Sequence, residues 1–188
     1  MEPFTLSRDV DAFNAIANDP AVHPFVARKG QAYLDFAAFF DDERNIGFLG
    51  KDCAFVAHYL EPGCYEVHSM ALPIARGRTV WQTAMAAIRH MFIATPAMEL
   101  LTRVAGGNVA AAALAAKVGF VLEFERKGGW EGPDGAKDCR FYAMRYPDWV
   151  KRQDWLMASG EWFHHGLLRE TATHDDDPAH DRYVGSCV

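Results

Sequence analysis

The segment that begins at Asn108 and ends at Phe120 constrains the fold of this chain more than any other. It opens with Asn, whose side-chain oxygen can cap a helix, continues through a run of alanines and stops at Gly119. Phe120 then starts an apolar run that is typical of a strand. The segment predicts a short helix followed by a strand. Its small residues suit either an ordinary core helix or close approach by a ligand.

The rest of the sequence predicts one α/β body. Helical spacing of apolar residues indicates helices, compact apolar runs indicate strands, and Gly or Pro clusters separate them. The expected helices are residues 6–18 (capped by Ser7), 31–40, 80–94 and 108–119, and the expected strands are 45–49, 53–60, 64–72, 100–104, 120–125 and 139–146, with a turn at 128–137. This order favours a single mixed sheet flanked by helices.

Composition and charge exclude several classes of protein. The chain has 188 residues, half of them hydrophobic, which suffices for one sizeable core. Its 19 Lys plus Arg against 25 Asp plus Glu give a net charge of −6 without a basic block, so we expect no nucleic-acid partner. The apolar stretch near the start is too short for a secretion signal or a membrane span. We therefore expect a cytoplasmic protein without membrane contact.

The region from Cys64 to Phe120 resembles the cofactor-binding core of the GNAT (Gcn5-related N-acetyltransferase) superfamily. Its predicted order is strand, loop, helix, strand, helix, and the more specific matches are Asn108, Ala111, Leu114, Lys117, Gly119 and Phe120. The resemblance implies a GNAT fold with a mixed, mostly antiparallel sheet. It also implies an N-acetyltransferase that moves an acetyl group from acetyl-CoA to a primary amine of a small molecule or protein. The acidic balance slightly favours cationic acceptors such as polyamines or aminoglycosides.

A phosphate-binding loop is expected before the helix at 80–94. GNAT enzymes place Gln or Arg, two residues, Gly, one residue, then Gly or Ala there, so that backbone amides cradle the pyrophosphate. This chain keeps a central Arg-Gly but has Ile74 first and a branched residue last; a solvated loop is the alternative. The cofactor contacts that the resemblance implies are Met70, Leu72, Arg76, Gly77, Arg78, Thr79, Asn108 and Ala111.

Glu66 and His68 are the candidate catalytic bases. They are two residues apart on a predicted strand, so their side chains share one face. Glu66 resembles a Glu of relatives that acetylate protein N-termini, and an imidazole titrates close to neutral pH. A solvated Glu and a core His are the structural alternatives. Ala115 stands where many GNAT enzymes carry a Tyr that protonates the departing thiolate, although the branch that acts on protein N-termini often lacks it too.

The last part of the chain is predicted to be an extension. We assign residues 1–146 to the acetyltransferase domain and 147–188 to a helical or extended tail that packs on the body, a second copy or another partner. Trp149, Trp155 and Trp162 lie in it, and tryptophans seldom stay wet. Its His and Asp residues lack metal-ligand spacing, so we expect no metal site.

A second resemblance is to GNAT-like proteins of tailed phages. It rests on Glu66 to His68, on the Arg-Gly of the loop, on Asn108 and on the His-Asp-Arg-Tyr sequence at 180–183. This resemblance implies an alternative function. The chain would then be a catalytically degenerate virion or assembly protein that binds its neighbours through the tail.

Overall fold

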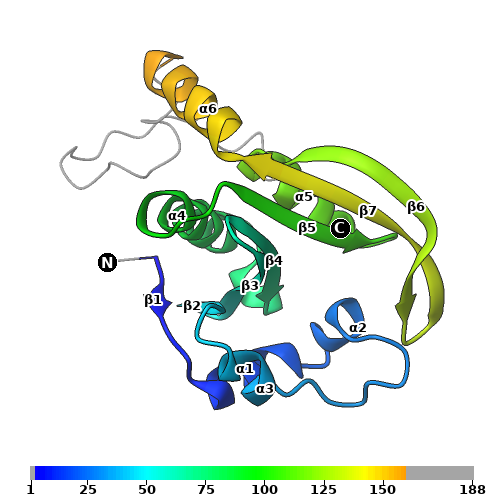
Figure 1. Cartoon of the computed structure of the whole chain (residues 1–188). Helices are drawn as coiled ribbons and strands as arrows, with labels where there is room; N and C mark the ends of the chain where they lie inside the picture. Colours follow the sequence, from blue (N-terminus) through cyan, green and yellow to red (C-terminus); the bar gives the residue numbers. More distant parts are fainter. Residues whose placement is uncertain (1–2, 160–188) are drawn as a thin grey trace, which may run out of the picture. The chain divides into compact units, whose positions relative to one another are not determined.

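The computed structural model of the chain describes residues 3–159, with side chains described as far as Trp155 (Figure 1). Residues 160–188, which include Trp162 and the His- and Asp-rich ending, lie outside the described residues. The tail's partners therefore stay a prediction. Within the described part, no helix is long and apolar enough to cross a membrane.

A seven-stranded sheet in the order β1-β2-β3-β4-β5-β7-β6 forms the centre of the body, residues 1–149. Every neighbouring pair is antiparallel except β4 and β5, which are parallel. The predicted mixed, mostly antiparallel sheet is thus confirmed. The strands are β1 (Thr5–Leu6), β2 (Ile46–Gly50), β3 (Cys53–Glu61), β4 (Cys64–Ala71), β5 (Glu99–Ala105), β6 (Val121–Gly132) and β7 (Gly135–Arg145).

Helices cover the two faces of this sheet. One face packs against α1 (Val10–Ala17), α2 (His23–Val26) and α3 (Ala37–Asp41). The other face packs against α4 (Arg78–Ala94), which follows a 3-10 turn at Pro73–Ala75, and α5 (Val109–Val118). The last helix of the described residues is α6 (Tyr146–Ser159). Trp149 near its start is buried, with its ring centroid 5.3 Å from that of Phe92 on α4.

Strands β4 and β5 are paired only where both begin. Their register joins Cys64 to Glu99, Tyr65 to Leu100 and Glu66 to Leu101, and no later residues of the two strands pair. Residues 67–71 of β4 remain paired with β3, and residues 102–105 of β5 with β7. The sheet therefore opens between its two central strands beyond Glu66.

The prediction of a helix over residues 6–18 with a Ser7 cap is wrong at its start. Thr5 and Leu6 pair with β2 instead, and the Ser7 amide donates to the Gly47 carbonyl at 3.0 Å, which keeps this stretch extended. The cap of α1 is Asp9, whose Oδ1 accepts from the Ala12 amide at 3.1 Å. A tertiary strand pairing has overridden the local helix signal.

The predicted helix over 31–40 is also mostly wrong, since only its end is helical. Two asparagines, one within α1 and one at its C-terminal end, bind the backbone that precedes α3. Asn18 accepts from the Leu34 amide at 2.8 Å, and Asn14 accepts from the Phe36 amide at 2.9 Å. Those bonds take amides that a helix would use for itself. Leu34 and Phe36 still reach the core, as half-buried neighbours of the cluster around Phe13.

The predicted turn over 128–137 is replaced by a longer hairpin. Strand β6 runs on to Gly132, and the register shift between Arg126 and Trp130 absorbs the extra residues as an irregularity of the strand. Gly128 has a φ of 61° within it, which glycine adopts without strain. The hairpin thereby extends toward α2, where the Lys29 amide donates to the Glu131 carbonyl at 2.9 Å.

Candidate active site

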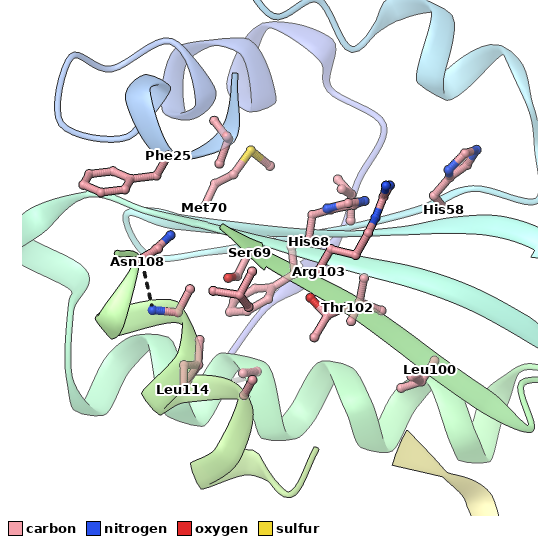
Figure 2. A pocket seen from close by; sticks show the side chains of 18 of the residues that line it. Phe25, His58, His68, Ser69, Met70, Leu100, Thr102, Arg103, Asn108 and Leu114 are labelled. Carbon is pink, nitrogen blue, oxygen red and sulfur yellow. Dashed lines mark hydrogen bonds between the residues drawn. The ribbon is translucent and has the colours of Figure 1, made fainter. Parts of the chain in front are cut away.

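A cavity of about 490 Å³ occupies the opening between β4 and β5 (Figure 2). Consecutive residues of β4, His68 and Ser69, both line it, although their side chains point to opposite faces of the sheet. Thr102 and Arg103 do the same from β5. The cavity therefore connects the face covered by α1 to α3 with the face covered by α4 and α5.

Glu66 and Arg103 form an ion pair across the two diverging strands. Arg103 Nε donates to Glu66 Oε1 at 2.5 Å and Arg103 Nη2 donates to Oε2 at 2.8 Å. Burial opposes ionisation of the Glu66 carboxyl, but the hydrogen bonds from Arg103 and the nearby positive charges outweigh it, so the pKa of Glu66 lies below its usual value. Glu66 is thus an ionised, doubly bonded carboxylate and does not itself line the cavity.

His68 stands beside this pair and faces the cavity. Its Nε2 lies 3.7 Å from Glu66 Oε1, and its side chain, which is 36% exposed, lines the cavity. Burial lowers the pKa of His68 below its ordinary value; Glu66 opposes this, while Arg103, His58 and Arg28 add to it. The imidazole is therefore neutral at pH 7 and can accept a proton.

The start of α5 forms the opposite wall. Asn108 Oδ1 accepts from the Ala111 amide at 3.1 Å, and both residues line the cavity (Figure 2). At the other end Gly119 has a φ of 108°, and the Phe120 amide donates to the Ala115 carbonyl at 2.9 Å, which closes the helix. Ala115 is buried in the cavity wall and brings no hydroxyl to it.

The predicted phosphate loop lies beyond the cavity lining. Gly77 has a φ of 94°, a conformation that suits glycine, and α4 starts directly after it with no side-chain cap on its first amides. Arg76 donates from Nη2 to the Ala21 carbonyl at 3.2 Å, so its guanidinium holds the segment after α1. Of the predicted cofactor contacts, the cavity gathers Met70, Asn108 and Ala111 but not Leu72, Arg76, Gly77, Arg78 or Thr79.

Several cavity residues were not found from the sequence. The sequence does contain a signal for Arg103, since a lone Arg within an apolar strand needs a buried partner. Ser69 and Thr102 give hydroxyls on the α5 side. Arg28 and Trp130 come from the α2 loop and from β6, and nothing in their local sequence indicates that they meet.

Comparison with solved structures identifies the fold. The chain is similar to spermidine N-acetyltransferase from Vibrio cholerae, solved with CoA and spermine, with a TM-score of 0.65 and 14% identity over 80% of this chain and 99% of that one. It is also similar to ribosomal-protein-S5-alanine acetyltransferase from Vibrio fischeri, with a TM-score of 0.64 and 14% identity over 79% of this chain and 96% of that one.

A third similar structure is a putative acetyltransferase from T. thermophilus, with a TM-score of 0.61 and 19% identity over 80% of this chain and 87% of that one. No protein-family model matches the sequence, and no curated protein does. A further solved structure in the same set is named as a GNAT-family acetyltransferase. The parted central strands, the capped helix beside them and these likenesses agree: the chain has the fold of the GNAT acetyltransferases.

Proposed function

We propose that this chain is an N-acetyltransferase that moves the acetyl group of acetyl-CoA to a primary amine. The observation that supports it most is the cavity through the β4–β5 opening, with a neutral imidazole on one side and the capped start of α5 on the other. Donor and acceptor can enter such a cavity from opposite faces of the sheet and meet between the strands. A similar solved structure, that of the spermidine acetyltransferase, contains CoA.

The donor binds on the α4 and α5 side in this proposal. The edges of β4 and β5 that face the opening are unpaired with each other, so their backbone groups can bind the amides of an extended pantetheine arm. The amides at the start of α4, after Gly77, suit the pyrophosphate, because helix N-termini favour anions. Asn108 and Ala111 contact the arm, and Met70 contributes its backbone, because its side chain packs near Phe13 on the other face. Leu72, Arg76, Arg78 and Thr79 complete the outer part of the site.

His68 is the proton acceptor in this proposal. It removes a proton from the acceptor's ammonium, and the amine nitrogen then attacks the acetyl carbonyl carbon. The carbon–sulfur bond breaks as the tetrahedral intermediate collapses, and the CoA thiolate leaves with its electron pair. The nitrogen loses its remaining extra proton to solvent as the amide forms, and solvent protonates the thiolate, because Ala115 offers no hydroxyl.

Glu66 acts through His68 in this proposal. Its carboxylate is already bound twice by Arg103, so its oxygens are less available to accept a proton than the imidazole nitrogen of His68. Its negative charge, 3.7 Å from His68 Nε2, stabilises the imidazolium that forms during the reaction. Glu66 is therefore assigned as a positioning residue.

The test is a calorimetric titration of the whole chain with acetyl-CoA, followed by a thiol-release assay over a panel of amines. Binding in the micromolar range and acetyl-CoA-dependent release of thiol with at least one amine are expected. A chain that shows no heat of binding and no rise in melting temperature at millimolar acetyl-CoA contradicts the proposal. The virion alternative and the cellular location both stay predictions, since the tail that would decide them lies outside the described residues.

A further inference from the structure

The side of the cavity that faces α1 to α3, opposite the proposed donor side, is positively charged; we call it the acceptor side. Arg28 and Arg103 both line it, and none of the residues lining it is acidic. The charge of Arg103 is balanced by Glu66 just outside the lining. Arg28 has no such balance, since no carboxylate pairs with it in the part of the chain that the structure describes. This local charge is opposite in sign to the net charge of the whole chain.

Two hydrogen bonds fix the backbone of the turn that carries Arg28. The Arg28 amide donates to Gln31 Oε1 at 3.1 Å, and the Gln31 amide donates to the Arg28 carbonyl at 3.0 Å. The neighbouring Lys29 amide joins the turn to the β6–β7 hairpin. The guanidinium carbon lies 5.9 Å from the centre of the Trp130 ring, within the range of a cation–π contact. This contact holds the guanidinium beside the cavity, and its planar N–H groups have the geometry to bind a carboxylate.

Aromatic side chains also line the acceptor side. Phe25, Phe36, Phe39 and Trp130 line the cavity, and Phe25 keeps 46% of its surface exposed. A large aromatic residue that stays half exposed in a cavity wall is suited to covering an apolar ligand. The lining thus combines an apolar surface with one unbalanced guanidinium.

We propose that the acceptor is a primary amine with an apolar body and a carboxylate, of the size of a hydrophobic amino acid. Arg28 binds the carboxylate, Phe25 and Trp130 cover the apolar body, and the amine points toward His68. This inference rests on the proposed acetyl transfer. It makes Arg28 the residue that determines specificity.

A polyamine fits this surface poorly. Its remaining ammonium groups would need carboxylates along the cavity, but no lining residue is acidic, and Glu66, just outside the lining, is already bound by Arg103. Close to Arg28 an ammonium would meet a like charge, which is unfavourable. The positive charge of Arg28 also reaches the reacting end of the site, since it helps to lower the pKa of His68. A carboxylate on Arg28 would relieve that effect.

Matched amine pairs test the inference. Phenylalanine and 2-phenylethylamine differ only in the carboxylate, as do leucine and 3-methylbutylamine, and spermidine serves as the cationic probe. We compare kcat/KM by thiol release, per concentration of neutral amine, and measure binding by calorimetry in the presence of CoA. Each carboxylated amine should exceed its partner by at least about tenfold, the effect of one charged hydrogen-bonded contact. Arg28→Ala should reduce that ratio to about one, and Arg28→Lys should keep part of it.

Lys29→Ala is the control, because it removes the same charge from the next residue, which does not line the cavity. It should leave the ratio unchanged. Transfer with no preference for the carboxylate, a preference that survives in Arg28→Ala, or a preference for spermidine would overturn the inference and leave the proposed function standing. Failure of every carboxylated amine to bind also overturns it. Binding that depends on Arg28 but is followed by no transfer upholds the inference and refutes the proposed activity.

Discussion

Arg103 on β5 holds the carboxylate of Glu66 on β4 by two hydrogen bonds, of 2.5 and 2.8 Å, at the level where the two strands separate. The pair spans the opening at its closed end, next to the last paired residues of these strands. Glu66 is almost fully buried, and about a third of the Arg103 side chain is exposed toward the cavity. The same contact thus fixes the cavity wall and sets the charge beside His68.

Arg103→Met should destabilise the fold by about 3 kcal/mol near neutral pH, because it leaves a buried carboxylate unpaired. In the native protein the pKa of Glu66 is lowered, so its ion pair contributes its full stability above the unfolded carboxyl pKa of about 4.3. This contribution is lost as the pH falls through the native pKa. In the variant burial dominates and raises that pKa, so the loss should be larger at pH 8 than at pH 5. Urea unfolding at both pH values measures this.

Two further variants make the stability test specific. Glu66→Gln combined with Arg103→Met should recover much of the lost free energy, because no charge stays buried. Arg145→Met removes an exposed partner of Glu123, with the pair 2.7 Å apart, and should cost less than about 1 kcal/mol. Equal losses in Arg103→Met and Arg145→Met would show that the Glu66 pair is not energetically distinct.

The acidic limb of kcat at saturating acceptor should report His68. Since the pKa of His68 is lowered, the limb should lie below about pH 6.5. Glu66 raises that pKa, so Glu66→Gln should move the limb to still lower pH, and His68→Ala should remove it and reduce kcat about a hundredfold. His58→Ala, at another histidine of the cavity, should keep the limb. A limb that persists in His68→Ala assigns the base elsewhere.

Asn108→Ala should weaken acetyl-CoA binding beyond what loss of a helix cap explains. Removing the cap alone costs about 1 kcal/mol of stability. Asp9→Ala is a close match, since Asp9 caps α1 through a bond of the same 3.1 Å length but does not line the cavity. Thermal unfolding and calorimetry together should show similar losses of stability but reduced affinity for Asn108→Ala alone. The same affinity in both would remove Asn108 from the donor site.

Gly77→Ala should lower the affinity for acetyl-CoA through its backbone. No atom stands within 4 Å of an added Cβ, so the cost arises from the positive φ of 94°, at about 1–3 kcal/mol. Relief of that strain would turn the first amides of α4 away from the pyrophosphate. Gly135→Ala, with a φ of 112° and equally open space, is the control and should leave the affinity unchanged in calorimetry. Unaltered binding in Gly77→Ala would separate this loop from the donor.

The sequence predicted best those parts of the fold whose signals are local. The helix that Asn108 caps and Gly119 ends is confirmed, because both residues act on their own backbone. The helices over 6–18 and 31–40 were misjudged, since the deciding contacts come from β2 and from Asn14 and Asn18. The His68 and Glu66 pairing followed from strand alternation. Arg28 meets Trp130 only through the docking of a loop on a distant hairpin, which no local pattern records.

The parting of β4 and β5 gives this sheet a second pair of edges, located in its interior. Outer edges of sheets invite the strands of other proteins and so promote aggregation. The inner edges at residues 67–71 and 102–105 instead border the cavity, between the helices that cover the two faces of the sheet. Their unpaired backbone groups are thus available to a ligand inside the cavity and not at the outer rim of the sheet. The fold thus places strand edges that could promote aggregation inside a cavity, where they can serve ligand binding instead.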